Sequence, residues 1–185
     1  MNKNINIRRL TTMAVMAALS VVLVFLVHFP LFAAAPFLEY DPADVPILIT
    51  ALAFGPLAGL AVTLVAAVVQ GVTVSANSGF YGILMHVFST GSFVLTAGII
   101  YKLKHNRTGA IVAIISGVLV SAGVMALANL LVVPVFMKVP VEVVKGMLVP
   151  IIIPFNLLKS GINGAITFVV YKSVSRFIKQ LSNAD

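Results

Sequence analysis

Four polar side chains lie at helical spacing in an otherwise apolar segment near the end of the chain. Asn156, Lys159, Ser160 and Asn163 fall at positions i, i+3, i+4 and i+7, so a helix places them on one face. A charge at membrane depth costs about 2.5 to 3.5 kcal/mol on insertion scales, and it needs a partner, a wet cavity or a ligand. This face therefore predicts noncovalent recognition of a polar solute. The alternative is a structural lysine that reaches an interface or holds a neighbouring helix.

Composition places the chain among membrane proteins. Hydrophobic residues make up 61% of its 185 residues and charged residues 9%, and the mean hydropathy is +1.13. A soluble globule of this length cannot bury so much apolar surface, so we expect a polytopic membrane protein. The absence of cysteine excludes disulfides, thiolate nucleophiles and cysteine-ligated metals. The net charge of +7 does not indicate nucleic-acid binding, because of how the cations are distributed along the chain.

Turn residues and charges divide the apolar sequence into six expected membrane helices. We expect a single all-α domain over residues 1–185, and an N-terminal segment that is retained because it lacks a signal-peptide cleavage site. The polar residues 138–146 predict a surface loop or a short interfacial helix. The expected spans run over approximately residues 10–30, 45–54, 55–74, 80–103, 109–134 and 147–171.

The second expected span is short and follows a patterned loop. Residues 45–54 cover only about 15 Å, too little for an upright crossing unless the preceding loop dips inward. Such shortness indicates irregular backbone around a cavity. The loop carries three acids, Glu39, Asp41 and Asp44, which we expect to face the external side.

The last expected span carries two prolines just before its polar face. Pro150 and Pro154 would kink the helix and leave backbone carbonyls free beside Asn156. Free carbonyls next to an amide side chain suit an uncharged polar heterocycle.

The distribution of cations predicts the orientation. In the six-span arrangement, nine of the twelve lysines and arginines lie on one side, against only Lys138 and Lys145 on the other. The positive-inside rule therefore puts both termini in the cytoplasm. The nine are Lys3, Arg8, Arg9, Lys102, Lys104, Arg107, Lys172, Arg176 and Lys179.

Further polar residues within the expected spans allow two interpretations. Thr63, Gln70 and Asn77 recur every seven residues, and Asn129 stands alone among aliphatic side chains. Buried amides and hydroxyls often form helix-to-helix hydrogen bonds worth about 0.6 to 2 kcal/mol, so packing and ligand contact are equally favoured. His86 has no carboxylate within its span, which argues against a metal site or a proton relay.

Catalytic motifs are absent from the sequence. It contains no G-x-x-x-x-G-K-[ST] phosphate loop, no H-E-x-x-H and no G-x-S-x-G, and the external acids fall in expected loops rather than in paired helical positions. A membrane enzyme, such as a lipid-modifying transferase, is therefore the less favoured class. No convincing internal repeat supports an inverted-repeat transporter either. The sequence predicts a binding subunit that is powered by other proteins.

Several segments resemble a known family, in order, over nearly the whole chain. Residues 14–20 (AVMAALS) after Arg8-Arg9, residues 37–46 (FLEYDPADVP) and residues 54–56 (FGP) resemble the substrate-binding subunit of an energy-coupling-factor (ECF) vitamin transporter. Residues 154–159 (PFNLLK) are similar to the riboflavin-specific member. The resemblance implies a six-helix bundle in a prokaryotic plasma membrane that binds riboflavin from outside, with the first loop as a lid.

The resemblance also implies the residues of the site. Asn156 and Lys159 would hydrogen-bond the polar edge of the flavin, with Asn129 as a further contact. Leu38 and Tyr40 would cover the ring. Riboflavin would be the transported substrate, so no cofactor is expected.

The implied partners are an ECF transmembrane coupling subunit and two cytoplasmic ATPases. Ala14 and Ala18, at i and i+4, would let the coupling subunit approach the first helix closely, as small-x-x-x-small faces do. Internal packing of the two alanines is the alternative.

The chemistry of the polar face leaves the ligand open. Isoalloxazine needs an apolar slot with a few donors and acceptors, which asparagine and lysine supply. Phosphate ordinarily calls for more than one cation, so riboflavin is favoured over flavin mononucleotide. Thiamine, biotin and a purely structural subunit are the remaining alternatives.

Overall fold

The computed structural model describes the backbone of residues 7–33 and 35–183, and the side chains of this part up to Tyr171 together with that of Ser173. Lys3 and the side chains of Lys172, Arg176 and Lys179 lie outside the described part. The helices are α1 (Ile7–Leu26), α2 (Asp44–Phe54), α3 (Pro56–Val72), α4 (Gly79–Leu103), α5 (Arg107–Met137), α6 (Val141–Met147), the π-helix η1 (Leu148–Ile152) and α7 (Ile153–Asn183). The strands are β1 (Phe29–Pro30) and β2 (Glu39–Tyr40).

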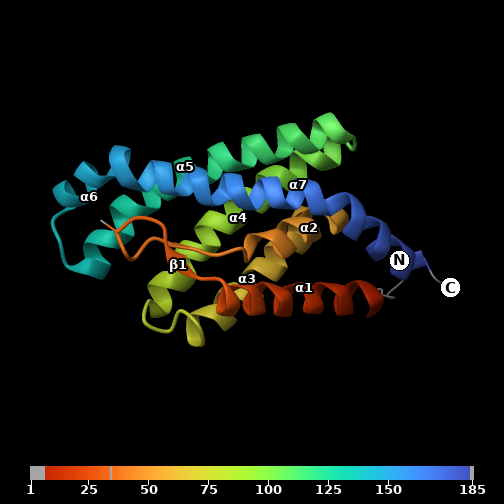
Figure 1. Ribbon diagram of the computed structural model, residues 1–185, viewed down its shortest axis with the longest axis horizontal. Coiled ribbons are helices and arrows are strands. Elements are labelled where there is room, and N and C mark those ends of the chain that lie inside the picture. Colours follow the sequence, from red (N-terminus) through yellow and green to blue (C-terminus); the bar gives the residue numbers. More distant parts are fainter. Residues whose placement is uncertain (1–6, 34, 184–185) are drawn as a thin grey trace.

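The long helices lie roughly along the long axis of the molecule, and the two ends of that axis differ (Figure 1). The start of α1, the end of α7 and the α4–α5 turn lie at one end, and the β1–β2 hairpin and α6 lie at the other. In the described residues, four helical stretches are long and apolar enough to cross a membrane: Ile7–Leu26, Gly79–Leu103, Arg107–Met137 and Val141–Tyr171. The expectation of a mostly helical membrane protein is confirmed. The expected all-α fold did not include the short β1–β2 hairpin.

Helix α2 is the centre of the bundle. All its residues from Asp44 to Leu52 are buried, and it packs against α1, α3, α4 and α7. A helix that is apolar all round must be enclosed by protein or lipid, and here protein encloses it. Gly55, with φ of 96°, turns the chain into α3, where Pro56 takes the first position and needs no backbone N–H.

Two prolines near the end of the chain lie inside helices, where the sequence predicts a helix end at Pro134 and a kink at Pro150. The π-helix η1 contains Pro150, so the helical path continues through a widened turn rather than a simple kink. Helix α5 contains Pro134 and runs on to Met137, past the expected end. It stops where Lys138 adopts a left-handed conformation with φ of 54°.

Cations of the described part gather at the end that holds the start of α1 and the end of α7. Arg8 and Arg9 begin α1, and the α4–α5 turn at the same end carries further basic residues (Figure 1). The Arg9 guanidinium donates to the Phe54 carbonyl at 2.9 Å, where it meets the negative end of the α2 dipole. The basic residues of the turn are Lys102, Lys104 and Arg107.

Candidate solute-binding site

A hairpin loop, residues 27–33 and 35–43, covers the α6 end of the bundle. Its two strands pair antiparallel, with Phe29 opposite Tyr40 and Pro30 opposite Glu39. Two apolar residues of the loop are buried: Ala35 is 0% and Leu38 is 6% exposed, and they join a second apolar core. The other buried members of that core are Val133, Val144, Ile152 and Phe155.

A cavity of about 170 Å³ lies beneath the hairpin loop. Its walls come from the loop, α3, the α3–α4 turn, α4, α5 and α7, so distant segments of sequence meet around it. The lining mixes apolar side chains with amides, hydroxyls and charges. Among its members are Phe37, Leu38, Glu39, Asp41, Gln70, Ser75, Ser78, His86, Met125, Asn129, Phe155, Asn156 and Lys159.

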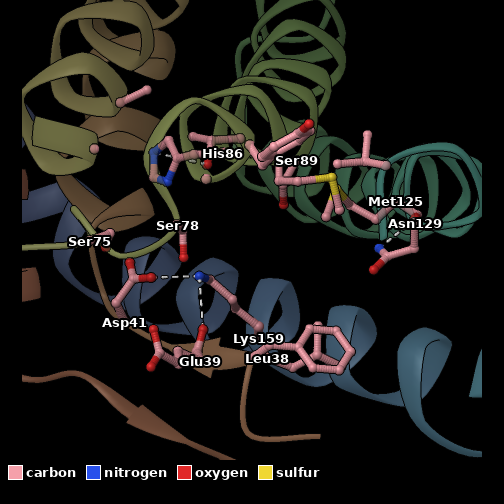
Figure 2. A pocket seen from close by; sticks show the side chains of 18 of the residues that line it. Leu38, Glu39, Asp41, Ser75, Ser78, His86, Ser89, Met125, Asn129 and Lys159 are labelled. Carbon is pink, nitrogen blue, oxygen red and sulfur yellow. Dashed lines mark hydrogen bonds and ion pairs between the residues drawn. The ribbon is translucent and has the colours of Figure 1, made fainter. Parts of the chain in front are cut away.

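Lys159 forms an ion pair with the hairpin loop. Its Nζ lies 2.6 Å from Asp41 Oδ2 and 3.3 Å from the Glu39 carbonyl oxygen (Figure 2). The two side chains are only 14% and 10% exposed. An ammonium has three N–H donors, so these contacts leave one for a ligand. The structure therefore supports the structural interpretation of Lys159 without removing it from the cavity wall.

Burial and charge act in opposite directions on the Asp41 carboxyl. Burial acts to raise its pKa, but the Lys159 ammonium and smaller contributions from His86 and the Ala43 N–H outweigh it. The pKa of Asp41 is therefore lowered, and the carboxylate stays ionised at neutral pH.

Asp44 is a second buried carboxylate, only 1% exposed. Its Oδ1 accepts from Thr90 Oγ1 at 2.5 Å and its Oδ2 from Asn163 Nδ2 at 2.9 Å. Asn163 Nδ2 also donates to the Asp41 carbonyl, and Ser20 Oγ to that of Ala43. This network joins the hairpin loop to α1, α2, α4 and α7.

The network corrects one expectation. Asp44 does not lie in an external loop, because it begins α2 and is enclosed by the bundle. The span of His86 contains no carboxylate, as its sequence shows, but another helix brings one near: His86 Nε2 lies 3.4 Å from Thr90 Oγ1, which donates to Asp44. No group of three or more His, Asp or Glu side chains that could hold a metal is present in the part of the chain that the structure describes.

The two predicted asparagines line the cavity and use their amide nitrogens within the helical segments that carry them. Asn129 Nδ2 donates to the Met125 carbonyl at 2.7 Å, and Asn156 Nδ2 to the Ile152 carbonyl at 2.8 Å. Each amide nitrogen is thus used on its own helical segment, and a carbonyl partner fixes which side-chain atom is the donor. Asn129 Oδ1 is buried and has no partner within the described residues.

Four of the five predicted ligand contacts line one cavity, and Tyr40 does not. Asn129, Asn156, Lys159 and Leu38 are brought together there from the loop, α5 and α7. Tyr40 is buried against Phe29, with ring centroids 5.5 Å apart, and its hydroxyl donates to Asn163 Oδ1. Burial, followed by the nearby Asp41 charge, raises its pKa. Adjacent side chains of a strand point to opposite faces, so Tyr40 points away from the cavity that its neighbour Glu39 lines.

Sequence reasoning missed several polar members of this site. The sequence pattern assigns Asp41 and Asp44 to an acidic loop without indicating their partners, and it does not predict the contact between His28 Nε2 and Glu39 Oε2 at 2.7 Å. One signal in the sequence could have indicated such a pair. A lone ammonium at membrane depth, here Lys159, needs a carboxylate partner, and the sequence before it offers few acids.

A family model described as "ECF transporter, substrate-specific component" matches residues 8–171. The chain belongs to this family of S components. It is a family of transporter components, so the protein is not an enzyme.

Similar proteins cover nearly the whole chain. Riboflavin transporter RibU of Staphylococcus aureus (strain TCH60) is 29% identical over 180 residues, with 94% of each chain covered. Riboflavin transporter FmnP of Bacillus subtilis (strain 168) is 25% identical over 186 residues, with 96% of this chain and 97% of the relative covered. A solved structure titled as the S component of a bacterial ECF transporter has a TM-score of 0.80 and 31% identity, and covers 92% of this chain and 97% of that chain.

The predicted docking alanines of this S component lie on the outer surface. Ala14 and Ala18 are exposed on α1, whereas Met16, Ala17 and Ser20 are buried against the bundle. Packing inside the bundle therefore does not account for the two alanines.

Proposed function

We propose that this S component binds riboflavin from the external side and serves as the substrate-specific subunit of an ATP-driven ECF transporter. Both curated relatives above are named riboflavin transporters. The observation that carries the proposal is the meeting of two amide acceptors and one ammonium donor, Asn129, Asn156 and Lys159, in one cavity.

The donors and acceptors match one edge of a flavin. Isoalloxazine carries an imide N–H between carbonyl groups on that edge. The imide N–H would donate to the oxygen of Asn129 or Asn156, and the remaining N–H of Lys159 would donate to a carbonyl. Leu38, Met125 and Phe155 supply the apolar surface that the ring needs.

Charge favours riboflavin over its phosphate. Glu39 and Asp41 line the cavity together with Lys159, so the carboxylates outnumber the ammonium by two to one. The Lys159 charge is already matched by Asp41. A phosphate dianion would meet net negative charge there, whereas an uncharged polyol would not.

Binding requires the cavity to widen. Its volume of about 170 Å³ is below the roughly 300 to 1,000 Å³ typical of sites for drug-sized ligands. The hairpin loop is the segment best suited to move, because it covers the cavity and lies outside the helices of the bundle. It would act as the lid, tied down by the Asp41–Lys159 pair.

The membrane arrangement is part of the proposal. Six helical segments would cross the bilayer, with α2 and α3 completing the four long stretches, and the basic end would face the cytoplasm. The exposed Ala14 and Ala18 would pack against the transmembrane coupling subunit, which two cytoplasmic ATPases would drive. The protein would reside in the prokaryotic plasma membrane.

Calorimetry and absorbance test the ligand. The chain purified in detergent from riboflavin-replete cells should carry a yellow flavin spectrum, and the stripped protein should bind riboflavin one to one. Flavin mononucleotide should bind more weakly. Clear binding of thiamine or biotin without binding of riboflavin would contradict the proposal.

A further inference from the structure

Two polar atoms of the cavity lining are buried without a hydrogen-bond partner in the described part of the chain. One is the acceptor Asn129 Oδ1 and the other is the donor Gln70 Nε2. Both residues line the same cavity, and they are 0% and 5% exposed. A buried polar group without a partner costs about 1 to 3 kcal/mol, so each atom calls for a group that the chain does not supply.

Gln70 differs from the other polar residue on its face of α3. Thr63, two turns earlier, is 0% exposed, and its hydroxyl donates to the Gly59 carbonyl at 2.9 Å. Its polar group is satisfied within its own helix, and it does not line the cavity. Thr63 and Gln70 therefore have different roles despite their seven-residue spacing: Thr63 packs within the bundle, and Gln70 lines the cavity.

Gln70 belongs to the hydroxyl-rich end of the cavity. The backbone carbonyl of Gln70 accepts the backbone N–H of Ser75 at 2.9 Å, which puts the end of α3 beside the turn that carries Ser75 and Ser78. Figure 2 shows these two serines on the side of the cavity near Asp41, away from Met125 and Asn129. The cavity thus has an amide end on α5 and a hydroxyl end on the α3–α4 turn.

We infer that Gln70 is a ligand-contacting residue whose Nε2 donates to a hydroxyl oxygen of the polyol chain of the ligand. This inference rests on the proposed function, in which the heteroatom edge of the flavin occupies the amide end. The ribityl chain then extends toward the hydroxyl end, where its oxygens can accept from Gln70. A neutral amide suits a neutral polyol beside the carboxylates of Glu39 and Asp41.

The test compares riboflavin with lumiflavin, which has a methyl group in place of the ribityl chain. Gln70→Met keeps the length of the side chain and removes the donor. It should weaken riboflavin binding roughly tenfold, as loss of one buried hydrogen bond does, and leave lumiflavin binding unchanged. Thr63→Val on the same helix face is the matched control and should alter neither affinity. Flavin fluorescence quenching in detergent measures both ligands.

The outcomes separate the inference from the proposed function. Equal losses for both flavins in Gln70→Met, or no loss for either, would overturn the polyol contact while riboflavin binding by the parent stands. If the variant does not fold, the parent alone decides: equal affinities for riboflavin and lumiflavin would show that no polyol contact contributes. A parent that binds neither flavin would overturn the proposed function and this inference with it.

Discussion

The Lys159 ammonium and the Asp41 carboxylate lie 2.6 Å apart, although 118 residues separate them in sequence. The contact joins the middle of α7 to the hairpin loop, and it matches the one ammonium among the described residues of the cavity lining with a carboxylate. Removing one member of a buried pair leaves an uncompensated charge, which typically costs about 3 to 5 kcal/mol. Lys159 is therefore expected to stabilise the closed loop as well as to contact a ligand.

Lys159→Met should affect both stability and binding. It keeps much of the stem but leaves Asp41 unpaired, so the thermal unfolding midpoint should fall. Riboflavin binding should weaken by about 1.5 to 3 kcal/mol, or roughly 10- to 150-fold, the range for hydrogen bonds to charged groups. Calorimetry on the folded fraction of the variant measures the change in riboflavin affinity.

The double variant Asp41→Asn/Lys159→Met separates the two roles of Lys159. It removes both charges, so stability should recover in large part while binding stays weak. If binding recovers together with stability, Lys159 only positions the loop and does not donate to the ligand.

Acid should destabilise the protein through Asp41. The pKa of Asp41 is lowered in the folded state, so as pH falls the unfolded chain takes up the proton first. The contribution of Asp41 is fully present above its ordinary value of 3.8 and is lost as pH falls through the lowered pKa. The difference in unfolding midpoint between the parent and Asp41→Asn should stay constant from about pH 8 to pH 5 and shrink below 3.8. A difference that grows on acidification would contradict the lowered pKa.

Thr90→Val should destabilise the network around Asp44. It removes the hydroxyl that donates to Asp44 Oδ1, and a buried carboxylate that loses a donor costs about 1 to 3 kcal/mol. Thr50→Val is the matched control, because Thr50 is equally buried but donates only to the Pro46 carbonyl of its own helix. Denaturation of both variants in detergent should show the larger loss for Thr90. Equal losses would mean that Asp44 does not depend on this contact.

Tyr40→Phe tests the corrected position of Tyr40. The variant keeps the ring but removes the donor to Asn163 Oδ1, so stability should fall by about 0.5 to 1.5 kcal/mol. Riboflavin affinity should change less than about twofold, because Tyr40 is outside the cavity lining. A large loss of affinity at unchanged stability would return Tyr40 to the ligand site.

Local patterns predicted the helices but not the partners of the polar groups. Helix positions depend on local sequence: apolar runs give the extent of a helix, and residues such as Gly55-Pro56 and the charged residues near Arg107 mark its ends. Helices α1 to α5 therefore lie close to their expected positions. The pairing of Lys159 with Asp41 depends on how the loop folds over α7, which no local period encodes. The same holds for Asp44, which the sequence pattern assigns to the acidic loop before the second expected span.

The hairpin loop shows that sequence patterns also fail to predict the direction of a single side chain. The expectation is that Leu38 and Tyr40 both cover the ligand ring, but only Leu38 lines the cavity. Two-residue strands carry too little alternation to be recognised in sequence, so the direction of the Tyr40 side chain could not be predicted.

The final prediction concerns the outer face of α1. Ala14 and Ala18 are exposed there, one turn apart and near the basic end of the helix. Membrane helices associate through close packing rather than hydrophobic exclusion, so Ala14→Trp should block approach of a partner helix. The purified variant should bind riboflavin as the parent does, because the alanine points away from the bundle. Co-purification with the coupling subunit and riboflavin uptake should both fall.

Leu127→Trp is the matched control for Ala14→Trp. Leu127 is an exposed apolar residue on α5, 66% accessible, so the change adds the same large side chain to a different outer surface. It should leave co-purification and uptake intact. Normal assembly and uptake by Ala14→Trp would place the docking surface on another helix. Loss of riboflavin binding by Ala14→Trp would instead mean that this face of α1 contributes to the bundle, because a substitution confined to a partner interface cannot change the affinity of the isolated chain.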